Sequence, residues 1–252
     1  MSSPAQSTSR HPGKSTYRPC YDEILMKLAV IVPAFNEATT INEVVRRLRA
    51  VPMDKEIIVV DDASTDGTDA ELEKVAGPDL IVIRHEHNQG KGAAIRTALP
   101  HVTAEAVVIQ DADLEYAPEQ LPSLLEPIAE GRADAVYGSR FMGSIEGMRL
   151  ANYLANKMLA WTATILYGQV ITDEATCYKM FRTDLIRSMP LECKRYEFCP
   201  EVTARTLLKK VHILELPIDY RGRTVLEGMK INLSDAFSAF ATLVKYRLRR
   251  KV

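Results

Sequence analysis

The chain has 252 residues, 46% hydrophobic and 26% charged, which suits one large globular domain. Its formal net charge of -1 gives no general attraction to nucleic acid, and no stretch reaches the roughly 18 consecutive apolar residues of a membrane span. The four cysteines form no C-x-x-C pair, which argues against a zinc site and a disulfide framework. Residues 1–26 start with a Ser-, Pro- and Thr-rich stretch, so we expect a disordered leader, not a secretion signal, before a cytoplasmic domain over 27–252.

Short apolar runs alternate with amphipathic stretches along residues 28–140. Because each run is apolar or β-branched and too short for a helix, we expect strands at Leu28–Val32, Glu56–Val60, Leu80–Ile83, Ala106–Ile109 and Ala133–Tyr137. Helices are expected between them, at Thr40–Ala50, from Asp66–Thr68, from Gly90 to Leu99 and at Pro118–Glu130. This alternation predicts an α/β fold whose sheet is mostly parallel, with right-handed crossovers.

A polar cluster follows each of the five predicted strands. Capping and turn chemistry would explain any one cluster by itself. The carboxyl ends of parallel strands meet at one edge of the sheet, where ligands bind, so five clusters together predict a site. The clusters are Asn36 and Glu37, Asp61 and Asp62, Asn88 to Lys91, Asp111 and Asp113, and Ser139 and Arg140.

The fourth cluster, Asp111-Ala112-Asp113, has the pattern of a metal site. Along an extended chain, side chains two residues apart point the same way. Two hard oxygen donors on one side suit Mg²⁺ or Mn²⁺, which also takes diphosphate oxygens as ligands. Two aspartates that each form a turn are the simpler interpretation of this motif alone.

Four stretches together resemble the family 2 glycosyltransferases: VPAFNE at 32–37, VVDDASTDGT at 59–68, NQGKG at 88–92 and DAD at 111–113. Over about residues 28–248 the chain looks most similar to the dolichyl-phosphate (polyprenyl-phosphate) mannosyltransferase branch. The resemblance implies a single Rossmann-like GT-A domain, its sheet flanked by helices, with a nucleotide-sugar half at 27–140 and an acceptor half at 141–252. It also implies inverting transfer of a hexose from a nucleotide-diphospho-sugar, such as GDP-mannose or UDP-glucose, with Mg²⁺ or Mn²⁺.

The resemblance also assigns expected roles to individual residues. The divalent metal would be held by Asp111 and Asp113, with Asp113 favoured as the direct and catalytic ligand. A basic set would hold donor and acceptor phosphates, with Arg140 also catalytic. Donor binding is expected of Pro33, Phe35, Glu37, Asp61, Asp62, Lys91, Asp111, Ala112 and Asp113, and phosphate binding of Arg140, Arg221, Arg223 and Lys230.

Residues 171–181 resemble the acceptor-side segment of the family and offer a general base. In relatives that transfer to a hydroxyl, an aspartate in this region can remove the proton, and Asp173 or Glu174 would do so here. Capping of the strand that begins near Thr176 is the competing interpretation. Glu201, in the first turn of a helix from Phe198, is favoured by the helix dipole whatever its function.

Two further helices have apolar faces. Over Tyr153–Tyr167 the helical spacing of Leu154, Met158, Trp161, Ile165 and Leu166 predicts core packing. A last helix starts near Ser234 and ends in a basic segment. Either it packs on the core, or it is an interfacial helix that seats the protein at the inner face of an anionic membrane. The apolar face of this last helix comprises Ala236, Phe237, Phe240, Leu243, Val244 and Leu248.

Two acceptors remain open, and two other functions are less favoured. A polyprenyl phosphate would attack without a strong base, whereas a sugar or other hydroxyl acceptor would need Asp173. A nucleotidyltransferase would carry a glycine-rich loop after the first strand, where this chain has Pro33–Glu37. A non-catalytic nucleotide-binding module would not need both carboxylates of 111–113 and a basic acceptor side.

Overall fold

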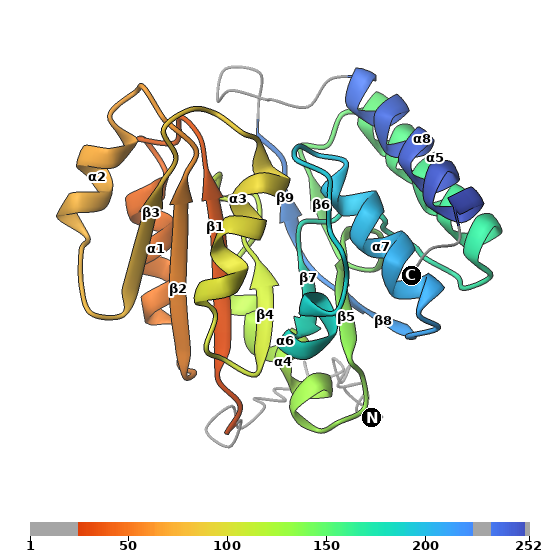
Figure 1. Cartoon of the computed structure of the whole chain (residues 1–252), viewed down its shortest axis with the longest axis horizontal. Helices are drawn as coiled ribbons and strands as arrows, with labels where there is room; N and C mark the ends of the chain where they lie inside the picture. The colour runs from red at the N-terminus through yellow and green to blue at the C-terminus, as the bar shows by residue number, and fades with distance from the viewer. Residues whose placement is uncertain (1–24, 224–232, 250–252) are drawn as a thin grey trace, which may run out of the picture.

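The computed structural model describes residues 25–223 and 233–249, with side chains of the last segment described from Ala236 on (Figure 1). Most of the predicted leader, 1–26, and Lys230 lie outside these residues. The strands are β1 Leu28–Ala34, β2 Lys55–Asp61, β3 Leu80–Arg84, β4 Ala106–Ile109, β5 Ala135–Ser139, β6 Ile145–Glu146, β7 Lys179–Arg182, β8 Ile213–Pro217 and β9 Tyr220–Arg221. The helices are α1 Ile41–Ala50, α2 Thr68–Lys74, α3 Lys91–Ala98, α4 Leu121–Ala129, α5 Leu150–Tyr167, α6 Thr183–Arg187, α7 Phe198–Leu208 and α8 Leu233–Arg249.

A seven-stranded sheet in the order β3-β2-β1-β4-β7-β5-β8 forms the centre of the protein. All neighbouring pairs are parallel except those made by β7, so the predicted α/β fold with a mostly parallel sheet is confirmed. Ile31 in the central strand pairs with Ile58 of β2 and Ile109 of β4. Leu28–Val32 are fully buried because helices cover both faces of the sheet, which explains why this strand is continuously apolar.

Helices lie on both sides of the sheet. In Figure 1, α3 crosses in front of the strands while α1 and α4 lie behind them. The predicted helix at 40–50 is confirmed as α1, which buries Ile41, Val44, Val45 and Leu48. Such a face, one apolar residue every three to four positions, is what holds a helix on a sheet. The sheet therefore presents the carboxyl ends of β1 to β5 at a single edge.

The position of β7 was not predicted. This strand lies between β4 and β5 and runs antiparallel to both. After α5 the chain returns to the carboxyl edge of the sheet, and β7 starts opposite Tyr137 and ends opposite Ala106. Because it enters from that edge, the segment just before it, residues 172–178, lies beside the polar clusters.

The predicted core packing of the apolar stripe on α5 is wrong except at Leu166, which is partly buried against the core. Leu154, Met158, Trp161 and Ile165 are exposed, and the helix instead buries Leu159, Ala160 and Ala163. Half of the predicted apolar face of α8 is exposed, at Phe237, Phe240 and Leu248, whereas Leu243 is buried and the other two residues are half-buried. Both helices are apolar on two sides, and α5, α7 and α8 pack on one another (Figure 1). Among the described residues, no helix is both long and apolar enough to cross a membrane.

Candidate active site

A cavity of about 490 Å³ lies at the carboxyl edge of the sheet. Each of the first four polar clusters contributes lining residues, and Arg140 joins them from the fifth. The opposite wall comes from α5, the start of α7, the segment after β9 and the start of α8. The clusters therefore converge as their positions in the sequence predict. The polar residues that line the cavity include Glu37, Asp62, Asn88, Lys91, Asp111, Asp113, Glu115, Arg140, Asn152, Asn156, Arg195, Tyr196, Tyr220 and Arg223.

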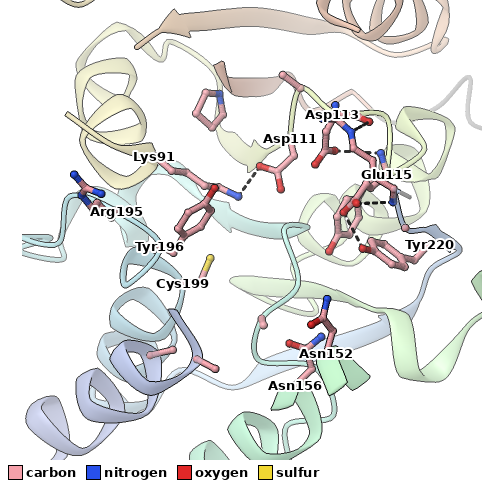
Figure 2. A pocket seen from close by; sticks show the side chains of 18 of the residues that line it. Lys91, Asp111, Asp113, Glu115, Asn152, Asn156, Arg195, Tyr196, Cys199 and Tyr220 are labelled. Atoms are coloured by element: carbon pink, nitrogen blue, oxygen red, sulfur yellow. Dashed lines mark hydrogen bonds and ion pairs between the residues drawn. The ribbon is translucent and has the colours of Figure 1, made fainter. Parts of the chain in front are cut away.

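Lys91 projects into this cavity and forms an ion pair with Asp111. Its Nζ lies 2.5 Å from Oδ1 of Asp111, and Figure 2 shows the two side chains pointing toward each other. Burial by itself would lower the pKa of the ammonium, but the charge of Asp111 outweighs it, and the pKa of Lys91 lies well above its usual value. Lys91 therefore carries a positive charge at neutral pH, at the first residue of helix α3.

The loop that positions Lys91 depends on a glycine and a carboxylate. Gly90 has a φ of +98°, and a Cβ there would lie 2.6 Å from the backbone oxygen of Lys194. Asp62 accepts hydrogen bonds from the backbone N–H groups of Gln89 at 2.8 Å and Gly90 at 2.7 Å. Asp62, the residue after β2, thus lines the cavity and also fixes the loop before α3.

Asp113 belongs to a turn after β4. Because the strand ends at Ile109 and Leu114 adopts a φ of +63°, the alternation of an extended chain does not continue to Asp113. Oδ1 of Asp113 accepts a hydrogen bond from the backbone N–H of Glu115 at 3.1 Å. The two aspartates lie in different parts of the cavity wall, Asp111 toward Lys91 and Asp113 toward Glu115 (Figure 2).

Glu115 is a third carboxylate in this wall. It accepts hydrogen bonds from the Tyr220 hydroxyl at 2.8 Å and from the backbone N–H of Arg223 at 2.8 Å. Burial and the charges of Asp111 and Glu115 raise the pKa of Asp113 to about 7, against the opposing effect of Arg223. The pKa of Asp113 therefore lies near neutral pH, and a bound cation would favour its ionised form.

The donor set fits a divalent metal of the Mg²⁺ or Mn²⁺ type. Asp111, Asp113 and Glu115 offer carboxylate oxygens, which such ions prefer. In the part of the chain that the structure describes, no three His, Cys, Asp or Glu side chains converge into a ready-made cage. That arrangement suits an ion held by one or two carboxylates that takes its remaining ligands from a diphosphate and water.

Arg223 contacts residues that follow β1 and β4. It donates to the backbone oxygen of Asp113 at 2.9 Å, and two of its nitrogens lie 2.6 and 3.3 Å from the carboxylate of Glu37. Glu37 follows β1, so this contact joins the segment after β9 to the first strand. Arg223 therefore connects the two walls of the cavity through Glu37 and Asp113. The sequence analysis predicted it only as a phosphate-binding cation.

Arg140 is held by the residue that was predicted as a general base. Its Nε and Nη2 each lie 2.7 Å from an oxygen of Asp173, and its backbone N–H donates to the same carboxylate at 3.0 Å. Both residues are buried, with Asp173 fully so. The guanidinium also lies over the Tyr220 ring, 5.1 Å from its centroid. Arg140 lines the cavity, but Asp173 is not among the lining residues.

Of three other residues that the sequence analysis singled out, two lie outside the cavity and one lines it. Asp61 is buried and accepts from the backbone N–H of Ser64 at 3.0 Å, and Arg221 is exposed. Neither lines the cavity. Glu174 does line it, fully buried, with its Oε1 3.8 Å from Nζ of Lys179.

Glu201 is a structural centre beside the cavity. Its carboxylate accepts from the backbone N–H groups of Glu192 at 2.9 Å and Cys193 at 2.8 Å, and from the Tyr246 hydroxyl at 2.6 Å. It thereby ties helix α8 to the loop that carries Arg195 and Tyr196. Burial by itself would raise the pKa of Glu201. The hydrogen bonds to its charged form outweigh burial, so the pKa of Glu201 is lowered.

Some cavity residues escaped the sequence reasoning. Glu115 stands two residues after Asp113, so the period that pairs Asp111 with Asp113 could have extended to it. Asn152 and Asn156 are spaced i, i+4 on α5, a spacing that places both on one face, and Figure 2 shows both at the cavity wall opposite the aspartates. Arg195 and Tyr196 lie on a loop without a recognisable pattern, so nothing in the sequence marked them.

Comparisons with known proteins agree with this geometry. Residues 29–189 match the family model "Glycosyl transferase family 2". An undecaprenyl-phosphate mannosyltransferase of Micrococcus luteus is 32% identical over 217 residues, which cover 81% of this chain and 87% of the relative. A UDP-N-acetylglucosamine–dolichyl-phosphate N-acetylglucosaminyltransferase of Methanococcus voltae is 32% identical over 231 residues, 80% of this chain and 92% of the relative.

Solved structures show the same fold. The glucosyl-3-phosphoglycerate synthase of Mycobacterium tuberculosis, crystallised with Mn²⁺, UDP and phosphoglyceric acid, matches with a TM-score of 0.70. The match is 21% identical in sequence and covers 96% of this chain and 84% of that one. At this identity the likeness concerns the architecture, which is the predicted GT-A fold.

Proposed function

The chain belongs to glycosyltransferase family 2, and on that basis we propose that it transfers a hexosyl group from a nucleotide-diphospho-sugar to a polyprenyl phosphate. The observation that carries the choice of acceptor is the Arg140–Asp173 pair. Since both oxygens of Asp173 are bound by Arg140 and the side chain does not line the cavity, it is poorly placed to remove a proton. A phosphate oxygen is already ionised at neutral pH and needs no such base.

The donor would bind along the ends of β1, β2 and β4. Pro33, Phe35 and Asp62 border the part of the cavity assigned to the nucleoside, and carboxylate oxygens there can accept from base or ribose groups. Lys91, charged and at the N-terminus of α3, suits the diphosphate. Asp113, with Asp111, would hold the divalent metal, which when bound would neutralise charge on the departing diphosphate.

The acceptor phosphate would lie against Arg140. A guanidinium anchored by Asp173 and stacked on Tyr220 presents a fixed planar edge, which matches phosphate oxygens better than a mobile ammonium does. An oxygen of this phosphate would form a bond to the anomeric carbon as the bond to the diphosphate breaks, with inversion. Arg140 and Arg223 would act by holding charge and orientation, which can lower a barrier without proton transfer.

A hydroxyl acceptor is the alternative. A protein of the same fold was crystallised with phosphoglyceric acid, so this acceptor is included in the experiment. A carboxylate would then have to leave Arg140 during the reaction, or Glu174 would have to serve. Burial raises the pKa of Glu174, although Lys179 opposes this, so its protonated form is favoured over a wider pH range than usual.

The experiment measures transfer by purified protein with GDP-mannose, UDP-glucose and UDP-N-acetylglucosamine, each with Mn²⁺ or Mg²⁺ and with EDTA. Each reaction contains a short-chain polyprenyl phosphate, phosphoglycerate or no acceptor. We expect metal-dependent product on the lipid phosphate only, and at least a 100-fold loss for Asp113→Asn. The matched control is Glu73→Gln, an exposed carboxylate on α2 outside the cavity, which should transfer normally. Product on phosphoglycerate alone, or transfer that persists in EDTA, would contradict the proposal.

A further inference from the structure

His85 is a buried histidine that stands behind the wall of the cavity. It follows the last residue of β3, and only 8% of it is exposed. Among the residues that the structure describes, no other histidine is buried, since His87, His101 and His212 are exposed. His85 does not line the cavity itself. A buried imidazole needs partners for its two ring nitrogens, and both partners of His85 belong to segments that border the cavity.

One ring nitrogen contacts the carboxylate of Asp62. Nδ1 of His85 lies 2.7 Å from Oδ1 of Asp62, and the two side chains are only 6% and 4% exposed. A carboxylate oxygen accepts hydrogen bonds and donates none, so this contact requires a proton on Nδ1 whatever the charge of the ring. The contact therefore fixes the position of the ring proton and the direction of the carboxylate together.

The other ring nitrogen contacts helix α3. Nε2 of His85 lies 2.9 Å from the hydroxyl oxygen of Thr97. This hydroxyl can donate to a neutral ring or accept from a charged one, so the contact suits both forms. Thr97 lies in the helix that begins at Lys91. His85 therefore joins Asp62, the residue after β2, to the helix that brings Lys91 into the cavity.

Asp62 has one hydrogen-bond position left for a ligand. A carboxylate offers about four lone-pair positions, two on each oxygen. His85 and the backbone N–H of Gln89 use both positions on Oδ1, and the backbone N–H of Gly90 uses one on Oδ2. Within the described residues this leaves one position, on Oδ2, for a donor group of a nucleoside. The direction of that position depends on the angle at which the carboxylate is held.

We propose that His85 is a positioning residue of the donor site, which holds the Asp62 carboxylate at the angle that lets Oδ2 accept one hydrogen bond from the nucleoside. This inference rests on the proposed function, because it takes the ligand at Asp62 to be the nucleoside of the donor. The backbone partners of Asp62 belong to a loop, whereas His85 is anchored by the end of β3 and by Thr97. Without His85 the carboxylate keeps its charge but loses its fixed direction.

Three substitutions separate the parts of this arrangement. His85→Leu removes both contacts, His85→Asn keeps an N–H donor near the place of Nδ1, and Thr97→Val removes only the contact to α3. Calorimetry with UDP and with GDP, each with Mg²⁺, measures the affinity, and transfer assays give kcat and the KM for the donor. We expect His85→Leu to weaken nucleotide binding and raise KM at least about tenfold, with kcat changed less than about threefold. His85→Asn should recover most of the affinity, and Thr97→Val should lose less than about threefold.

The matched control is Thr183→Val, which removes another buried hydroxyl. The Thr183 hydroxyl donates to the backbone oxygen of Ala104 at 2.7 Å, and the residue lies outside the cavity. This variant should lose stability as Thr97→Val does and bind nucleotide as the parent does. If His85 had a merely structural role, its variants would behave in the same way as this control.

A spectroscopic measurement needs no substitution that could impair folding. In protein with ¹⁵N-labelled histidine, the ring of His85 is recognised as the one whose N–H exchanges slowly with water, because it is buried. We expect its proton on Nδ1, and we expect the Nδ1 resonance to shift when UDP or GDP binds with Mg²⁺, because Asp62 then gains a donor. A proton on Nε2 alone, or a resonance that a bound nucleotide leaves unchanged, would overturn the inference.

The results also distinguish this inference from the proposed function. Full nucleotide affinity in His85→Leu, in a parent protein that transfers to polyprenyl phosphate, would reject only the inference. Nucleotide binding that depends on His85, without transfer to polyprenyl phosphate, would reject the proposed function alone. A parent protein that binds neither UDP nor GDP would overturn both.

Discussion

Replacement of Asp173 by Asn separates a positioning residue from a general base. In the folded protein the Asp173 carboxylate takes two hydrogen bonds from the Arg140 guanidinium and one from its backbone N–H, at 2.7, 2.7 and 3.0 Å. The asparagine side chain keeps the shape but loses the charge, and it turns an N–H donor toward a guanidinium that has only donors. The buried Arg140 charge then has no compensating partner at this position.

The size of the effect follows from burial. Asp173 is 0% exposed and Arg140 is 5% exposed, so solvent screens the pair little. Removing one partner of a buried ion pair costs about 3–5 kcal/mol, and we expect Asp173→Asn to lower the free energy of unfolding by that amount. Asp79→Asn is the matched control, since Asp79 pairs with Arg49 in the same way but is 42% exposed, and its loss should cost less than about 1 kcal/mol.

Urea denaturation of both variants gives the two free energies, and a pH–rate profile of the folded Asp173→Asn protein gives the second readout. We expect slower transfer with an unchanged shape of the profile, because only the orientation of Arg140 is disturbed. Two results together would refute this reasoning and restore Asp173 as a base. They are a loss of unfolding free energy below about 1 kcal/mol and a rate that no longer rises with pH as it does in the parent protein. In Arg140→Met/Asp173→Leu, stability should recover, whereas transfer should be lost because the guanidinium is gone.

Three further measurements test groups in the cavity and beside it. Since the pKa of Asp113 is raised to about 7, protons compete with the metal below that pH. Calorimetry should therefore show that the affinity for Mn²⁺ falls about tenfold per pH unit from pH 7 toward pH 5. An affinity independent of pH would contradict this. Gly90→Ala combines a φ of +98° with a clash against the facing loop and should cost at least about 2 kcal/mol, whereas Gly131→Ala, with a φ of +70° and open space, should cost about 1 kcal/mol by thermal unfolding. Tyr246→Phe removes one of four donors to Glu201 and should cost about 1–2 kcal/mol in urea, while a neutral result would show that α8 is not tied to this carboxylate.

Local pattern was enough to predict the sheet edge and its polar clusters. Strands such as Leu28–Ala34 are buried on both faces, and their composition says so without reference to the rest of the chain. In a mostly parallel sheet the segments that follow the strands lie at the same edge, so the convergence of Asp62, Lys91 and Asp111 follows from the parallel direction that the alternation predicts.

Partners far apart in the sequence could not be predicted in this way. Arg140 and Asp173 each looked like a group that acts on substrate, and only the fold shows that they bind each other across 33 residues. Arg223 was expected near the acceptor, yet it reaches Glu37, which is 186 residues away. The sequence gives the charge of each side chain. Which opposite charge lies beside it depends on the segments that the fold brings together.

The apolar stripe on α5 shows the same limit for packing. Period and composition correctly predicted a helix with an apolar side at Leu154, Met158, Trp161 and Ile165. They could not say which of its sides would face the protein, because both sides of α5 carry apolar residues. The sequence alone determined which residues share a side of each helix and an edge of the sheet. Only the tertiary structure decided which sides are covered, because burial depends on the shape of the neighbouring elements, here α7 and α8.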